Sequence, residues 1–575
     1  MFHIIVEKTV RKFLTITSLS VALCIGQPSF GQTTASQITP ETLTPELRQL
    51  DGSIIFSGQP GTQAPPGAEA IGVTLAAVDL QGGLSEMASA HTTFVARLTR
   101  GRIPVSELFD ATSELEAAYA SEGYVLSRVM LPQQSLRDGG VLRVVVLNGF
   151  VEEIDTTSVP DQTRARIEGL TKPLIGRPGL TQDELERQLL LAGDTPGTAL
   201  RTALGAGKEQ GGALIVLEPE FRPITGFVGA GTPASDDLGK MKFDFGLEFN
   251  SPLRFGETIY LRVGGAPDEI LTADPVSRIL ALGAVVPLGF SGLTLNGEIT
   301  DARTTQTDTL SPTRSSFSRK SLRLAYPFIR SRTVNLDGVL SLDHQTDAQD
   351  LIGGARIYED RISVLRFGGT VNVIHEKQAV TSAGMTLSQG LNVFDARSKK
   401  DALSSGVPLS RSGADAVFTK LVGSISHQRS LNDALTLSVV GRFQSSFGDA
   451  LVTSEQMTLV GPNELSSFNS GSLRGDSGWV VRSELSTRFG TDIGQIPVLF
   501  SPYVFWGFGA VSLENPTATE RTHTQAKSYG IGIDLFTQTN SNFRSNSMRV
   551  EFGRGERNDG EPSENRFSFV SNFRF

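Results

Sequence analysis

The sequence is nearly free of cysteine. Cys24 is the only one in 575 residues, and it lies in the apolar N-terminal stretch. Removal of that stretch would leave no thiol, which excludes disulfide bonds, cysteine metal ligands and a cysteine nucleophile in the mature protein. A disulfide-free exported protein of this length is compatible with a bacterial envelope, where such crosslinks are permitted but not required.

Catalytic and metal-binding patterns are also scarce. The six histidines are scattered, and no two have the spacing of metal ligands on a helix. The glycines at Gly229-Ala230-Gly231 lack the Gly-Lys pair of a P-loop, and no Gly-x-Ser-x-Gly occurs in an α/β pattern. We therefore expect no catalytic residue, no metal and no cofactor, and interpret the chain as something other than an enzyme.

Long apolar runs are absent after residue 31. No stretch there approaches the ~18 apolar residues of a membrane-spanning helix. If the chain crosses a membrane, it must do so as a closed β-barrel, because only a helix or a closed barrel satisfies every backbone group in lipid. The formal net charge of −9 gives no reason to expect a nucleic-acid partner.

The N-terminus has the layout of a secretory signal peptide. Basic residues up to Lys12 precede an apolar run over 13–26, and small residues follow up to Gly31. We predict a signal peptide over residues 1–31, with cleavage near its end. An uncleaved membrane anchor is the alternative, but the apolar run is shorter than the ~20 residues that a spanning helix needs.

Residues 32–66 are rich in Thr, Pro, Gln and Gly and are predicted to form a linker. Thr44 and Pro45 offer one helix start, with Thr44 as N-cap and Pro45 at the first helical position. The linker is expected either to carry one short helix on a tether or to be a disordered tail. Whether residues 33–60 plug a pore is left open.

Two small α+β units are predicted next, over residues 67–149 and 150–220. In the first, apolar residues at three- and four-residue spacings predict a helix over 104–121, followed by strands at Tyr124–Leu131 and Val141–Asn148. The second unit repeats a strand, two helices and two strands. We interpret the two as tandem modules of about 75 to 80 residues, at the small end of domain sizes.

From residue 221 to 575 strand alternation replaces helical spacing. The stretch 241–249, for example, alternates apolar side chains with Lys, Asp, Gly and Glu. A soluble β-sandwich has the same period, so alternation alone does not distinguish it from a membrane barrel. The signal peptide, the long polar loops such as 301–318 and 396–413, and an aromatic last strand favour a transmembrane antiparallel barrel. Its length fits sixteen strands with spans of about 9 to 11 residues.

The last strand carries phenylalanine on one face, ending in Phe573 and Phe575. A terminal aromatic strand resembles the signal by which bacterial outer-membrane barrels are recognised for insertion. Outer-membrane lipid and, during insertion, the barrel-assembly machinery are therefore expected partners.

Several segments occur in the order of one known family. They are GYVLSRV at 123–129, LPQQ at 131–134, DTPG at 194–197, YPFIRSR at 326–332 and LSRSGAD at 409–415. Each segment alone is weak evidence for the family, but together the segments span most of the mature chain. The sequence resembles the two-partner-secretion transporters, the TpsB or haemolysin secretion/activation family of the POTRA-barrel superfamily.

The resemblance implies an outer-membrane translocator of a Gram-negative bacterium. Its two modules would be POTRA modules in the periplasm that recognise a large unfolded exoprotein, TpsA-like and of the haemolysin or adhesin type. The barrel would pass that protein to the cell surface. The alternatives are a barrel-assembly factor and, less favoured, a passive porin.

An exposed sheet edge can capture an extended chain by strand addition, because main-chain hydrogen bonds make little demand on sequence. The two strands of the first module are the candidate edges; the alternative is that both are internal to it. The candidate residues are Tyr124, Val125, Leu126, Val129, Val144 and Val146.

The stretch 461–485 corresponds to a loop that, in the family, folds back into the barrel and pairs a tip arginine with an aspartate of the wall. The resemblance places Leu465, Ser466, Ser467 and Phe468 at the tip, with Ser466 at the arginine position and Gly507 at the aspartate position. Losing both partners is close to neutral, whereas losing one leaves an uncompensated charge. On this alignment, Ser466→Arg alone should be more harmful than Ser466→Arg with Gly507→Asp.

Overall fold

The computed structural model describes residues 32–45, 54–55, 64–233, 235–239, 241–307, 311–376, 378–493, 496–537 and 541–575. The predicted signal peptide at 1–31 lies outside these residues, as does any helix continuing beyond Pro45. None of the described helices is long and apolar enough to cross a membrane.

The first module is a four-stranded sheet covered by two helices. Its strand order is β3-β2-β5-β4, with β2 and β5 parallel. Leu108, Leu115 and Tyr119 of α3 pack with Leu142 and Val144 of β5 in one core. The elements are β2 (Gly72–Gln81), α2 (Ala88–Leu98), β3 (Arg102–Pro104), α3 (Val105–Ser121), β4 (Arg128–Met130) and β5 (Gly140–Leu147).

The predicted helix over 104–121 is confirmed as α3, whereas α2 is not predicted. Its sequence ASAHTTFVARL buries only Phe94 and Leu98, so its apolar periodicity is weak. The predicted strand at Tyr124–Leu131 shortens to the three residues of β4.

The second module is also a four-stranded sheet with two helices. A capping box between Thr181 and Glu184 starts α5. The strand order is β1-β7-β8-β6, with β6 and β8 parallel, and β1 pairs parallel with β7 through Thr202 and Ala203. The elements are β1 (Ile54–Ile55), β6 (Phe150–Asp155), α4 (Asp161–Thr171), α5 (Gln182–Gly193), β7 (Thr198–Ala206) and β8 (Gly212–Phe221).

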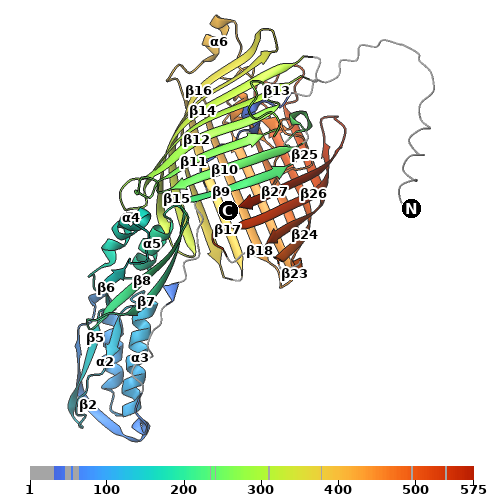
Figure 1. Cartoon of the computed structure of the whole chain (residues 1–575). Helices are drawn as coiled ribbons and strands as arrows, with labels where there is room; N and C mark the ends of the chain where they lie inside the picture. Colours follow the sequence, from blue (N-terminus) through green and yellow to red (C-terminus); the bar gives the residue numbers. More distant parts are fainter. Residues whose placement is uncertain are drawn as a thin grey trace, which may run out of the picture. The chain divides into compact units, whose positions relative to one another are not determined.

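The remaining residues form a closed antiparallel barrel, in which β9 pairs with β27 to complete the ring (Figure 1). β22 and β23 both pair with β24 and count as one wall strand, so the wall has sixteen strands, as predicted. A helix, α6 (Lys399–Ser405), lies between β17 and β18. The wall strands are β9 (Ile224–Gly231), β10 (Lys242–Asn250), β11 (Thr258–Gly265), β12 (Ser277–Pro287), β13 (Thr294–Gln306), β14 (Thr313–Arg330), β15 (Val334–Leu351), β16 (Arg356–His375), β17 (Ala379–Leu391), β18 (Thr419–Ser430), β19 (Leu435–Ser445), β22 (Ser477–Thr487), β23 (Phe489–Ile493), β24 (Ile496–Ser512), β25 (His523–Thr537), β26 (Ser545–Arg557) and β27 (Glu564–Arg574).

Burial along the wall is the reverse of that in a soluble protein. On β13, Glu298 is 3% exposed while its neighbour Ile299 is 59% exposed. Likewise, Arg482 and Glu551 are buried, whereas Phe552 is exposed. Apolar side chains thus face outward and charged ones inward, which distinguishes a membrane barrel from a sandwich.

Candidate functional site inside the barrel

A loop over residues 446–476 runs from β19 into the barrel and returns to β22. Its base is held by the fully buried carboxylate of Asp476, which accepts hydrogen bonds from the N–H of Leu451 at 3.0 Å and of Glu514 at 2.7 Å. The two limbs pair as β20 (Met457–Thr458) and β21 (Arg474–Gly475).

The loop tip, residues 464–469, lies across the inner wall and touches a series of strands from β19 to β27. Leu465, Ser467 and Phe468 are each at most 1% exposed. The contacts are Glu464 with β19, Leu465 with β24, Ser467 with β25, Phe468 with β26 and Asn469 with β27. The tip is therefore a band over six of the sixteen wall strands, from β19 to β27.

Glycines on β24 and β26 make room for this band. A Cβ at Gly507 would lie 2.9 Å from Cδ2 of Leu465, and one at Gly555 would lie 2.6 Å from the ring of Phe468. The predicted tip and Gly507 are thus in contact, but through Leu465 rather than Ser466. An aspartate at position 507 has no room unless Leu465 moves.

Ser466 lies beside an ion pair of the wall. Its hydroxyl accepts a hydrogen bond from Nη1 of Arg482 at 2.7 Å and donates one to Glu551. Arg482 on β22 also bonds Glu551 on β26 directly, at 2.5 Å, and its guanidinium lies 3.8 Å from the ring centroid of Phe505. At Ser466, which the family resemblance assigns to a loop arginine, the positive charge therefore comes from the wall.

Two carboxylates of the loop bond cations of the wall. Glu464 accepts from Nε of Arg442 on β19 at 2.6 Å and from its Nη2 at 2.8 Å. Glu455, 1% exposed, accepts from Nη2 of Arg366 on β16 at 2.6 Å and lies 2.7 Å from Nζ of Lys420 on β18. Both ion pairs join the loop to the wall.

Residues 32–45 also lie inside the barrel and include one helical turn, α1 (Ala35–Ile38). A capping box between Thr34 and Gln37 starts it. It lies ahead of the predicted start at Thr44, whose hydroxyl bonds Oδ1 of Asn296 on the wall at 3.2 Å.

This segment contacts both the wall and the loop. The N–H of Ala35 donates to Oγ of Ser315 on β14 at 3.1 Å. The hydroxyl of Thr33 donates to the backbone oxygen of Ser470 at 3.2 Å. The segment and the loop are therefore joined to each other inside the lumen.

Two cavities remain, one on each side of the segment. The first, about 410 Å³, is lined by Thr39 and Glu41. The second, about 530 Å³, is lined by Ile38 and Leu43 and reaches the tip at Ser466. Open space thus remains on both sides of the segment.

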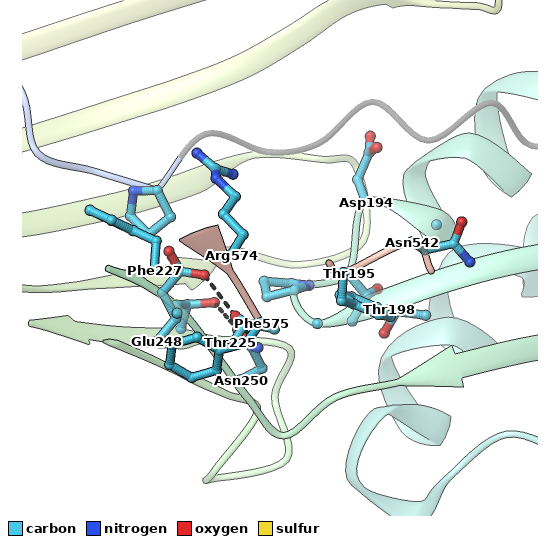
Figure 2. Close-up of a pocket in the computed structure, with 17 residues that line it drawn as sticks. Asp194, Thr195, Thr198, Thr225, Phe227, Glu248, Asn250, Asn542, Arg574 and Phe575 are labelled. Atoms are coloured by element: carbon cyan, nitrogen blue, oxygen red, sulfur yellow. Dashed lines mark hydrogen bonds between the residues drawn. The ribbon is translucent and has the colours of Figure 1, made fainter. Parts of the chain in front are cut away.

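A smaller cavity of about 110 Å³ lies where the second module meets the barrel. Figure 2 shows Asp194, from the turn after α5, near Thr225 and Asn250 of the wall and the terminal Phe575. Asp194 also accepts from Nε and Nη2 of Arg330, each at 2.8 Å. The turn that carries the DTPG segment therefore connects the module to the barrel.

The predicted capture strand β5 has no free edge. It pairs with β2 on one side and β4 on the other, and Val144 and Val146 are buried. This part of the prediction is wrong, because both residues belong to the module's core. On β4, the N–H of Val129 donates to the carboxylate of Glu116 at 3.0 Å, which covers that edge.

The residues ahead of β4 form a turn rather than a strand. The N–H of Tyr124 donates to the backbone oxygen of Tyr119 at 2.9 Å, and Val125 packs against the second module's core. Leu126, 7% exposed, is part of that core. Val125 and Leu126 therefore join the modules to each other, and Tyr124 packs against the first module's core, so none of the three presents an edge.

Arg442, Glu464, Arg482 and Glu551 are absent from the predicted site. For Arg442, Arg482 and Glu551 the signal in the sequence is a charge amid apolar residues of an alternating strand, as in Val480-Val481-Arg482; Glu464, in the loop, has no such signal. Such a charge predicts a lumenal position, but not a partner, since Arg482 and Glu551 lie 69 residues apart. Within the described residues, no group of three or more His, Cys, Asp or Glu side chains is placed to hold a metal.

The chain matches the family model described as haemolysin secretion/activation protein ShlB/FhaC/HecB over residues 213–535. It belongs to this family. The model for the ShlB-type POTRA domain matches residues 73–149. The first module is therefore a POTRA domain.

Individual relatives extend the match. The outer membrane transporter CdiB of Escherichia coli O6:K15:H31 (strain 536 / UPEC) is 24% identical over 501 residues, which cover 83% of this chain and 82% of CdiB. The heme/hemopexin transporter protein HuxB of Haemophilus influenzae (strain 86-028NP) is 21% identical over 441 residues, 75% of each chain. The solved structure of CdiB from Escherichia coli has a TM-score of 0.68 at 19% identity, covering 94% of this chain and 95% of that one.

The protein is thus a TpsB transporter. It resides in the outer membrane, with its POTRA region in the periplasm, and it secretes an exoprotein across that membrane. Its partner is accordingly a TpsA-like exoprotein.

Proposed function

We propose that the exoprotein crosses the barrel as an unfolded chain, through the space that the loop tip and residues 32–45 now fill. The supporting observations are that both segments form polar contacts with the wall and that residues 32–45 border cavities of about 410 and 530 Å³, the second of which reaches the tip. A polar lumen lets a solvated chain pass without adhering to it. Folding outside the cell would make exit irreversible without ATP.

The second module, residues 150–220, acts as a second POTRA module, and its β7 edge captures the exoprotein. Residues 54–55 already add to β7 as a parallel strand at Thr202 and Ala203, so this edge accepts an extended chain. A photoreactive residue at the exposed Ala203 should crosslink the exoprotein. One at the exposed Val141 of the first module is the matched control and should not.

The cargo is one dedicated protein of the haemolysin or adhesin type. Deleting the gene should remove a single large protein from the surface or medium and leave other outer-membrane proteins at normal levels. Loss of many barrel proteins together would favour a barrel-assembly factor instead. Unchanged secretion would favour a passive pore.

Phe573, on β27, and Phe575, directly after it, are 48% and 37% exposed, with ring centroids 6.2 Å apart. They serve as the signal for insertion by the assembly machinery into outer-membrane lipid. Replacing both by alanine should leave less folded barrel in the membrane. The same change at Phe447 and Phe394, exposed phenylalanines outside the wall strands, is the control.

A further inference from the structure

Ser466 and Gly507 lack the loop arginine and wall aspartate that the family resemblance assigns to them. Another charge pair joins the loop to the wall, with the two charges exchanged. The acidic group is on the loop, at Glu464, and the basic group is on the wall, at Arg442 of β19. Both carboxylate oxygens are engaged, by Nε at 2.6 Å and by Nη2 at 2.8 Å. This two-point geometry is the strong form of an arginine–carboxylate contact.

Arg442 holds the loop at a second point. Its Nη2 also donates to the backbone oxygen of Thr458 on β20, at 2.6 Å. One guanidinium therefore joins the wall to the hairpin and to the tip. Releasing the tip requires this contact to break.

The other lumenal ion pairs near the tip behave differently. Arg482 and Glu551 are both on the wall, so their bond survives if the loop leaves, and Ser466 contributes only a neutral hydroxyl. Glu455 joins the loop to the wall, but it lies outside the tip and its side chain is 1% exposed, bonded to Arg366 and Lys420. The side chains of Arg442 and Glu464 are 27% and 15% exposed, which leaves this pair open to the lumen.

We propose that Arg442 and Glu464 are the latch that holds the loop tip in the barrel, with the acid on the loop and the base on the wall. They are positioning residues, because they act through the place of the tip. The inference rests on the proposed function in one respect: release of the tip is taken to widen the path for the exoprotein.

The test measures the ionic current through the purified full-length protein in planar lipid bilayers with KCl solution on both sides. Glu464→Gln and Arg442→Gln each remove one charge at similar size, and each should raise the fraction of time in the open state about tenfold. The exchanged variant, Glu464→Arg with Arg442→Glu, should return it to within about twofold of the unmodified protein. Glu248→Gln is the matched control, because Glu248 pairs at 2.6 Å with Arg262, a wall residue.

A second readout follows Ser470, the residue directly after the tip. The mature chain has no other cysteine, so Ser470→Cys can be labelled alone with a membrane-impermeant maleimide. Its labelling should quicken in the Glu464→Gln background and slow again in the exchanged background. This measurement separates movement of the tip from a general leak of the barrel.

Open fractions of the two single variants within twofold of the unmodified protein would overturn the latch. So would an exchanged variant no better than the singles, or an equal effect of Glu248→Gln. These outcomes leave the proposed function standing if the exoprotein is still secreted. If the variants give the expected currents but the unmodified protein secretes no exoprotein, the latch stands and the proposed function is wrong.

Discussion

Ser466 lies between Arg482 and Glu551, which already form an ion pair with each other. Its hydroxyl bonds both Arg482 and Glu551, and those two side chains are 1% and 3% exposed as a pair. The charges of Arg482 and Glu551 therefore balance each other, and the site needs no charged residue on the tip. A small hydroxyl fits because both neighbours are fixed by the wall.

Ser466→Arg should destabilise the seated loop. A second guanidinium would lie beside Arg482, compete for Glu551 and overfill a buried site, at a cost of about 1–3 kcal/mol. Adding Gly507→Asp should not rescue it, because the new carboxylate displaces Leu465. Thermal unfolding of the two variants checks this, with Ser404→Arg on the exposed face of α6 as the control. This expectation reverses the one drawn from the family alignment, and a stable double variant would restore that alignment.

His91 gives the first POTRA domain a pH dependence. Burial lowers the pKa of His91 from its ordinary value of 6.5, and its Nε2 lies 2.7 Å from the hydroxyl of Tyr119. Below that ordinary pKa the unfolded chain binds more protons than the folded one, so stability falls as the pH falls.

The full chain should therefore unfold more readily at about pH 5.5 than at about pH 7.5, with protection lost first in α2 and α3. His91→Gln should reduce this difference. Hydrogen exchange of the two helices, corrected for its intrinsic pH dependence, provides the measurement. An unchanged difference in the variant would assign the effect to another group.

At the scale of elements, the loop fits because the wall strands under it lack side chains. Gly507 and Gly555 lie under Leu465 and Phe468, and Gly553 lies under Ser467, whose Oγ would be 2.2 Å from an added Cβ. An alternating strand normally carries a side chain at each lumenal position. Glycine at these positions turns the wall into a shallow groove for the tip.

Gly555→Ala should unseat Phe468 and raise the ionic current, because its Cβ would collide with a ring that is 1% exposed. A cost of about 1–3 kcal/mol to loop seating is expected. Gly490→Ala on β23 is the matched control, since nothing lies within 4 Å of its added Cβ. Equal currents from the two variants would contradict a groove that holds the tip.

The sequence predicts some helices and strands correctly and misses others. α3 follows from spaced apolar residues, and β10 from the alternation over 241–249, because each pattern reports one buried face. The helix α2 has too few buried positions to show a period. β4 and β5 look alike in sequence, yet only the sheet order shows that β5 is internal. Neighbours in a sheet are set by contacts between distant residues, which local patterns do not contain.

At the scale of the whole molecule, two segments that are far apart in the sequence lie in the lumen. Residues 32–45 and the loop over 446–476 meet where Thr33 bonds Ser470. Each also bonds the wall. Opening a path for an exoprotein therefore requires both to move, and movement of either removes a contact of the other.

A crosslink between the N-terminal segment and the wall should hold the pore closed. The N–H of Ala35 lies 3.1 Å from Oγ of Ser315, so Ala35→Cys with Ser315→Cys places two thiols within reach of a disulfide. Oxidation should abolish secretion of the exoprotein, and a reductant should restore it. Ser315→Cys alone is the control, and secretion by the oxidised pair would show that the segment need not leave.

The sequence by itself determined the architecture: apolar alternation, the absence of long apolar runs and the ordered family segments suffice for modules ahead of a barrel, because these signals are local and periodic. Only the tertiary structure decided how the loop is held. The partners Arg442 and Glu464 are a charge on a wall strand and a charge in a loop. Their pairing depends on how the loop folds back through the closed barrel, and no local pattern in the chain encodes that return.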